Sequence, residues 1–372
     1  MKNNLSMKIL YYFAEDSSYM SQWQRIHIFD ELSHYNYNID VFNPLDYESY
    51  DESNEKLIKS INKCNVKYDI FMTCVGSDSI YSETIDKIKK LGLPTLLICF
   101  DNLHAPYMHK KIAPHFDLVW LTSYETKLMF ENWGCQNIVV QPYAANPFQF
   151  KPYWKETISS VSFIGTPYGG RINKLNLLTN SNIQCDVFTD NIATKANIKK
   201  INFYQYNDLY INLINSLKFK IGRKVLLGAI INKLFNKNSV LESNSNLILN
   251  PSVSFDEMQY LYSNYALSLN ITELRNTYIL KKPVHKLHLR TFEIPMCGGI
   301  EIASYTDELS TYFEDGKEIV LYKSEDELIS KTKFYLDKKN IDICLRIREK
   351  ARKRAESDHT WMCRFKILDS LC

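Results

Sequence analysis

Short apolar segments that alternate with helical patterns constrain the fold of this chain more than any other feature. The run Pro94–Phe100 contains Leu, Ile and Cys without polar alternation, which is typical of a parallel strand buried on both faces. Helical spacing lies between such runs, where Trp23, Ile26 and Phe29 recur every three residues. Repeated strand–helix units predict an α/β fold built from parallel, doubly wound sheets.

The alternation occurs twice along the 372 residues, a length that suggests about two domains. Pro147 and Pro152 interrupt regular structure between the two series. We therefore expect a Rossmann-like lobe over residues 1–148, a second over 149–355 and a closing helix over 356–372. Strands are expected at Lys8–Phe13, Ile39–Phe42, Ile70–Cys74, Pro94–Phe100, Leu118–Leu121, Ile138–Gln141, Val161–Ile164, Gln184–Thr189, Leu267–Ile271, Ile300–Ser304 and Lys317–Tyr322.

Composition and charge argue against several classes of protein. The formal net charge of +3 is not that of a dedicated nucleic-acid binder, and no apolar run approaches the roughly 20 residues that span a bilayer. The apolar stretch 5–13 is short and interrupted by Lys8, so we interpret it as a strand rather than a signal peptide. Nine scattered cysteines without a C-x-x-C pair favour reduced thiols in a cytoplasmic protein and no metal cluster.

The most informative segment is Arg290–Ala303, in which a short helix opens with a carboxylate and ends at Gly298-Gly299. A carboxylate such as Glu293 can accept hydrogen bonds from two neighbouring ribose hydroxyls. A helix N-terminus and an arginine such as Arg290 can face anionic phosphates. Residue types alone fit equally a capped helix with a surface Arg–Glu pair.

The pattern R-x-F-E-x-P-x-C-G-G at 290–299 resembles the glycosyltransferases similar to spore maturation protein CgeB, and more broadly the nucleotide-binding lobe of GT-B glycosyltransferases. The segment His359-Thr360-Trp361 resembles the closing motif of that family, and Val161–Gly165 followed by Arg171 resembles the start of its second lobe. The resemblance implies a GT-B architecture, with two Rossmann-like lobes that face a central cleft.

The same resemblance implies roles for particular residues. Glu293 would hold the ribose of the donor, and Arg290 and Arg171 would neutralise its diphosphate. Gly165 would let the backbone approach the donor. His285 stands where many retaining GT-B enzymes carry a second carboxylate, so it would contact a phosphate or a sugar hydroxyl instead, and the stereochemical outcome stays open.

Polar residues at the end of the strand Pro94–Phe100 are candidates for acceptor chemistry, because ligands bind at the carboxyl ends of parallel strands. If the enzyme inverts, Asp101 or His104 could act as the general base; otherwise they could be a turn residue and a loop histidine. Glu15 and Asp16 are weaker candidates of the same kind. His109 and His115 flank two lysines, and we expect a basic surface loop there rather than a metal site.

Residues 218–237 contain six cations, interleaved with large apolar side chains that include Ile221, Val225, Leu226, Ile230, Leu234 and Phe235. This pattern predicts a basic amphipathic helix, which is either an ordinary surface helix or a peripheral contact with the inner face of a membrane.

We therefore expect a glycosyltransferase that moves a sugar from a nucleotide-sugar donor to a glycan, lipid-linked or protein acceptor, with no metal and no cofactor. The alternatives are a nucleotide-sugar epimerase on the same fold and a non-catalytic nucleotide-sugar-binding protein.

Overall fold

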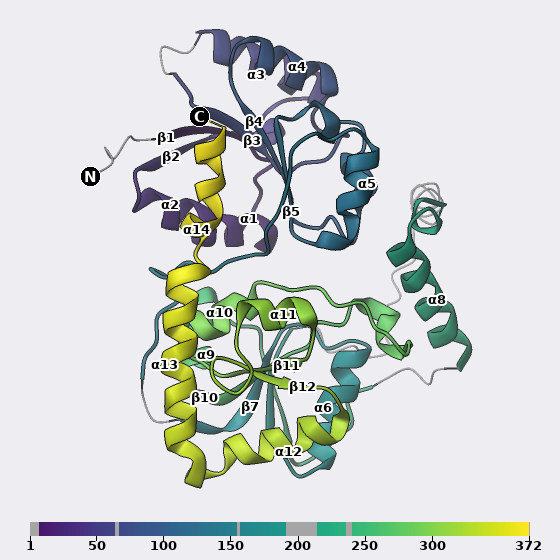
Figure 1. Ribbon diagram of the computed structural model, residues 1–372, viewed down its shortest axis with the longest axis vertical. Coiled ribbons are helices and arrows are strands. Elements are labelled where there is room, and N and C mark those ends of the chain that lie inside the picture. Colours follow the sequence, from purple (N-terminus) through teal and green to yellow (C-terminus); the bar gives the residue numbers. More distant parts are fainter. Residues whose placement is uncertain (1–6, 64–66, 155–156, 191–213, 236–239, 372) are drawn as a thin grey trace. The chain divides into compact units, whose positions relative to one another are not determined.

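The computed structural model describes residues 7–63, 67–154, 157–190, 214–235 and 240–371. The chain divides into two compact units (Figure 1). The N-terminal unit contains residues 1–146 and 360–372, and the C-terminal unit contains residues 147–359. No helix among the described residues has the length and apolar character needed to cross a membrane.

The N-terminal unit is built on a parallel six-stranded sheet with the order β2-β1-β3-β4-β5-β6. Its strands are β1 (Met7–Tyr12), β2 (Tyr37–Phe42), β3 (Ile70–Thr73), β4 (Thr95–Cys99), β5 (Leu118–Leu121) and β6 (Ile138–Val140). The chain moves from β1 to β2 in one direction and then to β3 in the other, so the strand order reverses between β1 and β3. Ligands of open α/β sheets bind at such a reversal.

Helices cover both faces of this sheet. They are α1 (Tyr19–Gln24), α2 (Asp30–Ser33), α3 (Tyr50–Lys63), α4 (Ser82–Lys90), α5 (Lys127–Asn132) and α14 (Trp361–Phe365). The returning helix α14 packs on α2, where Glu31 accepts hydrogen bonds from the amides of Trp361 (3.1 Å) and Met362 (2.6 Å). Burial raises the pKa of Glu31 to about 7, although these amides and Arg364 oppose the shift.

The C-terminal unit has a second parallel six-stranded sheet, with the order β12-β11-β10-β7-β8-β9. Its strands are β7 (Ile158–Ile164), β8 (Cys185–Phe188), β9 (Leu247–Asn250), β10 (Tyr265–Asn270), β11 (Glu301–Ser304) and β12 (Val320–Tyr322). The chain runs from β7 through β8 to β9 on one side, and from β10 through β11 to β12 on the other. The strand order therefore reverses between β7 and β10.

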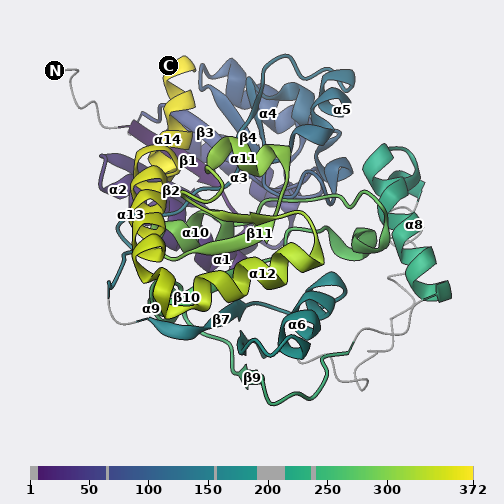
Figure 2. The same cartoon turned by 60° about the horizontal axis from the view of Figure 1, so that its bottom comes forward.

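The helices of this unit again lie on both faces of the sheet, except α8, which stands apart from it. They are α6 (Gly170–Asn180), α8 (Lys220–Phe235), α9 (Phe255–Asn264), α10 (Arg290–Met296), α11 (Asp307–Tyr312), α12 (Glu325–Leu336) and α13 (Ile341–Asp358). Helices α6 and α12 pack together, and α10 packs against α9 and α13 (Figures 1 and 2). Buried Val, Leu, Ile and Phe side chains of the strands form the core beneath α6 and α12.

The structure confirms the predicted α/β class and the predicted strands, with ends shifted by up to three residues. Sequence reasoning missed β9, a four-residue edge strand, although its apolar run Leu247-Ile248-Leu249 was an available signal. The expected single closing helix over 356–372 is wrong in its bounds. Helix α13 ends at Asp358, and Thr360 caps a separate helix, α14, by accepting from the amide of Cys363.

Candidate functional site

The predicted donor residues Gly165 and Arg290 meet where the strand order of the C-terminal sheet reverses. Gly165 directly follows β7, and its φ of +137° is one that side chains rarely tolerate. Arg290 opens helix α10. Its Nη2 atom lies 2.6 Å from the position that a Cβ atom at residue 165 would occupy. The arginine therefore occupies the space that the glycine leaves open.

Arg171 brings a second guanidinium to the same place. Its Cζ atom lies 4.4 Å from the ring centroid of Tyr168, and the Cζ atoms of Arg171 and Arg290 are each 5.9 Å from the Phe163 ring. Nη1 of Arg171 donates to the carbonyl of Thr166 at 3.0 Å. Burial and the charge of Arg290 lower the pKa of Arg171 to about 10, although Tyr168 and Glu273 oppose the shift. An anion between the two cations would relieve their mutual repulsion.

Several polar atoms around this point are buried without a hydrogen-bond partner among the described residues. They are Nε of Arg171, Nη1 of Arg290, Oδ1 of Asn270, Oε2 of Glu273 and Oε2 of Glu301. A buried polar atom left unpaired costs about 1–3 kcal/mol, so native proteins pair nearly all of them. A cluster of such atoms of both polarities makes this point a candidate site for a polar ligand.

Asn270 hydrogen-bonds to Thr291, the residue after Arg290, and to the buried carboxyl group of Glu301. Nδ2 of Asn270 donates to Oγ1 of Thr291 (3.0 Å) and to Oε1 of Glu301 (2.7 Å). Burial raises the pKa of Glu301 to about 8, partly offset by Asn270 and Arg290. Glu301 is therefore largely protonated at neutral pH, and Arg290 keeps its positive charge available for a ligand.

Glu273 is a carboxylate of this site that sequence reasoning missed. Oε1 of Glu273 accepts from Oγ of Ser304 at 3.1 Å, and its backbone forms an antiparallel bridge with His285. Nδ1 of His285 is 2.8 Å from Oγ1 of Thr272. Burial lowers the pKa of His285, opposed by the charge of Glu273. The sequence could have indicated Glu273, because Thr272 and Glu273 directly follow the predicted strand Leu267–Ile271 and ligands bind at the carboxyl ends of parallel strands.

Glu293 lies in the first turn of α10 and is only 1% exposed. The structure therefore places this predicted ribose ligand on the same short helix as Arg290, with its side chain buried. Its proposed role stays a prediction. The neighbouring Gly298-Gly299 pair ends the helix as expected, with Gly298 at a φ of +66°.

The structure places the two predicted acceptor residues in the turn after β4. The amide of His104 donates to the carbonyl of Asp101 at 2.9 Å, Asp101 is half-buried and His104 is exposed. The charge of Asp101 raises the pKa of Tyr143, after the larger effect of burial. Glu15 instead forms an ion pair with Arg25 at 2.5 Å, and Asp16 accepts from Ser18 and Ser21, so both have local structural partners.

The reversal of strand order in the N-terminal sheet carries a different polar group. The hydroxyl of Tyr11 donates to Oε1 of Gln24 at 2.6 Å, and Nε2 of Gln24 lies 3.9 Å from Sγ of Cys74.

The expectation that His109 lies in a basic surface loop is wrong, because its side chain is 2% exposed. Burial lowers the pKa of His109 to about 4, and the charge of Asp101 opposes this shift. His115 is at the surface, where Nδ1 lies 2.9 Å from a carboxylate oxygen of Asp86.

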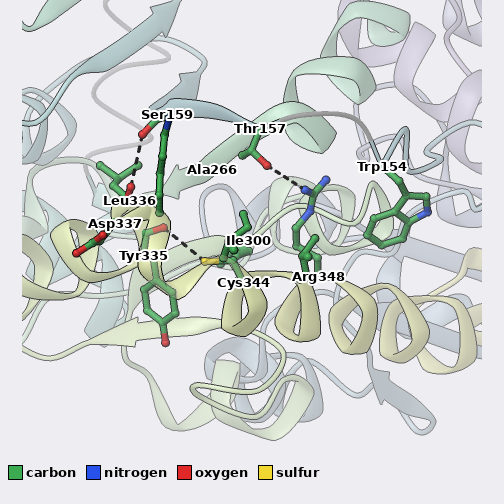
Figure 3. A pocket seen from close by; sticks show the side chains of 13 residues that line it. Trp154, Thr157, Ser159, Ala266, Ile300, Tyr335, Leu336, Asp337, Cys344 and Arg348 are labelled. Carbon is green, nitrogen blue, oxygen red and sulfur yellow. Dashed lines mark hydrogen bonds between the residues drawn. The ribbon is translucent and has the colours of Figure 1, made fainter.

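A pocket of about 540 Å³ lies at the opposite edge of the C-terminal sheet (Figure 3). It is lined by residues at the amino ends of β7, β10 and β11, including Ser159 and Ala266, and by α12 and α13. Arg348 points into this region, but it already donates to the carbonyls of Gly298 (2.6 Å) and Ser263, and lies 5.3 Å from the Trp154 ring. None of the predicted donor residues lines this pocket.

Residues 218–369 match a family model described as glycosyl transferase-like. No curated protein matches the chain in sequence.

Solved glycosyltransferase structures resemble the whole chain. HepE of Anabaena in complex with UDP matches with a TM-score of 0.58 at 12% identity, over 98% of this chain and 99% of that chain. A glycosyltransferase from Rickettsia africae matches with a TM-score of 0.57 at 11% identity, over 98% and 97%. Sucrose-phosphate synthase from Thermosynechococcus elongatus matches with a TM-score of 0.54 at 12% identity, over 98% of both chains.

At such low identities the structural likeness defines the fold, which is the GT-B fold. The sequence match is to transferases, which favours this class over the epimerase and binding-protein alternatives. The chain therefore has the GT-B fold, and its residues 218–369 match a glycosyl transferase-like family model.

Proposed function

We propose that the protein binds a nucleoside-diphosphate sugar in its C-terminal unit and transfers the sugar to an acceptor hydroxyl. The observation that carries this proposal is the pair of guanidinium groups of Arg171 and Arg290, each with a buried N–H that has no partner in the described part of the chain. They lie at the reversal of strand order, where α/β sheets bind nucleotides. A diphosphate would pair with both groups and offset the repulsion that lowers the pKa of Arg171.

The remaining groups of the site suit the other parts of such a donor. Glu293 would accept from the ribose hydroxyls, as the CgeB-like motif implies, and Gly165 would admit the backbone to the diphosphate. The unpartnered Oε2 atom of Glu273 would accept from a hydroxyl of the sugar, and His285 would hold that loop or contact the sugar. Two arginines could supply the positive charge that the leaving group needs, so the proposed reaction requires no metal ion.

The proposed reaction is a substitution at the anomeric carbon. The acceptor oxygen forms a bond to that carbon, the bond from the carbon to the donor phosphate oxygen breaks, and the nucleoside diphosphate leaves toward Arg171 and Arg290. Asp101 or His104 would take the proton of the acceptor hydroxyl. We propose a glycan, lipid-linked or protein acceptor in the cytoplasm. UDP-glucose is the first donor to test, because HepE of Anabaena has been solved with it.

Calorimetry with UDP and UDP-glucose tests the donor site. Arg171→Ala and Arg290→Ala should each weaken UDP binding by about ten-fold or more, because a charge-assisted hydrogen bond is worth roughly 1.5–3 kcal/mol. Arg290→Lys keeps the charge and serves as a milder variant if an alanine variant fails to fold. Arg346→Ala, at an exposed position of α13, should bind UDP normally. Unchanged UDP affinity in folded Arg290→Ala would reject the proposed site.

Assays of donor breakdown test the reaction. Release of UDP from a UDP-sugar should rise when a matching acceptor fraction is added, and the sugar should appear in that fraction. Nucleotide binding without UDP release, across a panel of donors and acceptors, would instead favour a binding protein. Activity that persists after treatment with EDTA would support the metal-free reaction, and its complete loss with rescue by Mg²⁺ would reject it.

A further inference from the structure

Helix α8 and the sequence that flanks it carry charge of one sign only. Residues 209–241 contain six cations and no acidic residue. Four of these cations, Lys220, Arg223, Lys224 and Lys233, belong to α8 itself. The helix stands apart from the C-terminal sheet in both views (Figures 1 and 2). A segment of this kind is attracted to anionic surfaces.

One face of α8 is fixed on the C-terminal unit. Ile221, Gly222 and Gly228 are buried, and α8 packs on the 3-10 helix η6 (Arg275–Ile279). A Cβ atom at Gly228 would lie 2.6 Å from the carbonyl oxygen of Asn276, so only glycine allows this close approach. Oδ1 of Asn232 accepts from the hydroxyl of Tyr278 at 3.1 Å. The orientation of the helix is therefore set by specific contacts.

The opposite face of α8 is apolar and exposed. Leu227, Ile230 and Leu234 follow one another at helical spacing, and their exposed fractions are 50%, 56% and 69%. Phe235 at the end of the helix is 79% exposed. An ordinary surface helix turns its apolar side chains inward and its cations outward, whereas here both are outside. Large aliphatic side chains rimmed by lysines are typical of helices that lie in a lipid–water interface.

We propose that α8 docks on an anionic lipid surface, with Leu227, Ile230 and Leu234 entering the headgroup boundary and the four cations contacting lipid phosphates. The absence of acidic residues over 209–241 favours a lipid over a protein partner, because a protein interface usually places both signs of charge at its rim. The helix would lie on the membrane rather than cross it, since none of the described helices could span a bilayer. This proposal does not depend on the sugar-transfer proposal.

Co-sedimentation of the full chain with vesicles tests the docking. Vesicles of phosphatidylcholine with about one third phosphatidylglycerol should bind the protein at low salt, and vesicles of phosphatidylcholine alone should not. Binding should weaken markedly as salt approaches a few hundred millimolar, because salt screens the cations. Replacing Lys220, Arg223, Lys224 and Lys233 with Gln should lower the partition coefficient by about a hundredfold.

Two further variants test whether binding depends on the exposed apolar face of α8 or only on the total positive charge of the chain. Leu227→Ser, Ile230→Ser and Leu234→Ser together should weaken binding to phosphatidylglycerol vesicles by about tenfold or more, with little effect on the melting temperature, because these side chains are already exposed. The matched control replaces four other exposed lysines of this unit, Lys333, Lys339, Lys350 and Lys353, with Gln. It removes the same charge and should bind vesicles almost normally.

Three results would overturn the proposal. The unmodified chain could fail to bind strongly anionic vesicles, or the control could lose binding as fully as the α8 variant. The apolar face could instead mediate contact between copies of the chain, seen as a concentration-dependent dimer that the triple Ser variant abolishes. None of these measurements reports on sugar transfer, so their failure leaves the proposed function untouched.

Discussion

The guanidinium of Arg290 occupies the space beside Gly165, where its Nη2 atom lies 2.6 Å from the position of a Cβ atom at residue 165. The glycine follows the first strand of the C-terminal sheet, and the arginine opens a helix 125 residues later. The glycine makes the position of the arginine possible, because any side chain at 165 would displace the cation.

Gly165→Ala should therefore impair donor binding through Arg290. The added methyl group pushes the guanidinium away, and the φ of +137° adds backbone strain of about 1–2 kcal/mol. We expect UDP affinity measured by calorimetry to fall by about tenfold or more. Gly316→Ala is the matched control, since it also has a positive φ of +73° but nothing within 4 Å. If both variants bind UDP equally well, the contact with Arg290 does not matter for binding.

Glu293→Gln tests the proposed ribose contact. The amide has nearly the same shape as the carboxylate, so the melting temperature should change by only a few degrees. Loss of a charge-assisted pair with the ribose hydroxyls should raise the dissociation constant for UDP by about ten-fold. Because Glu293 is 1% exposed, a purely structural role has a distinct signature: a large drop in melting temperature with normal UDP affinity.

Glu273→Gln separates recognition of the sugar from recognition of the nucleotide. We expect affinity for UDP to stay nearly constant, while turnover with a UDP-sugar falls by about tenfold, because Oε2 of Glu273 would contact only the sugar. Glu349→Gln, at an exposed position of α13, is the control and should leave both quantities unchanged. Equal losses of UDP and UDP-sugar affinity would instead assign Glu273 to the diphosphate.

The raised pKa of Glu301 predicts a pH dependence. This carboxyl has a folded-state pKa of about 8 because of burial, so it ionises as pH rises from about 7 to 9. The carboxylate then pairs with Arg290 and repels the diphosphate, so UDP affinity should fall over that range. The same shift means that the folded state holds the proton more tightly than the unfolded chain. The free energy of unfolding contributed by this group should therefore decline as pH rises from about 4.5 to 8.

Glu301→Gln should flatten both dependences, since the amide does not ionise. Calorimetry with UDP and melting temperatures, both measured as functions of pH, check the two parts independently. A Gln variant whose UDP affinity still falls between pH 7 and 9 would assign the titration to another group.

Gly228→Val tests whether the contact of α8 with η6 supports the donor site. Tyr278 of η6 lies against Gly169 and Gly170 at the start of α6, the helix that contains Arg171. A valine would clash with the carbonyl of Asn276 and push η6 away from α8. We expect weaker UDP binding, by about three- to tenfold, in a chain that remains folded. Ala229→Val, at the next and less crowded position, should bind UDP normally.

The sequence by itself determined the α/β class, nearly all of the strands and the motif around Arg290 and Glu293. Those features are local, because a buried parallel strand needs an unbroken apolar run, and a helix start needs a few residues in a row. Sequence also placed Thr272 and Glu273 after a strand, although they were not recognised as part of the site. The basic helix predicted over 218–237 was likewise evident from its pattern alone; the structure shows it at Lys220–Phe235, and residues 236–237 lie outside the described residues.

Tertiary structure decided which of these residues meet. The pairing of Gly165 with Arg290, the stacking of Arg171 on Tyr168 and the raised pKa of Glu301 arise from the order of strands and from burial, which no short segment encodes. His109, which the sequence analysis placed in a surface loop, is buried in the structure. The direction of the apolar face of α8 was open in the sequence. In the structure, the face of α8 that contains Gly228 packs on η6, so Leu227, Ile230 and Leu234 on the other face are exposed to solvent. A helix with apolar residues on several sides could have packed by another face, and its sequence does not decide between them.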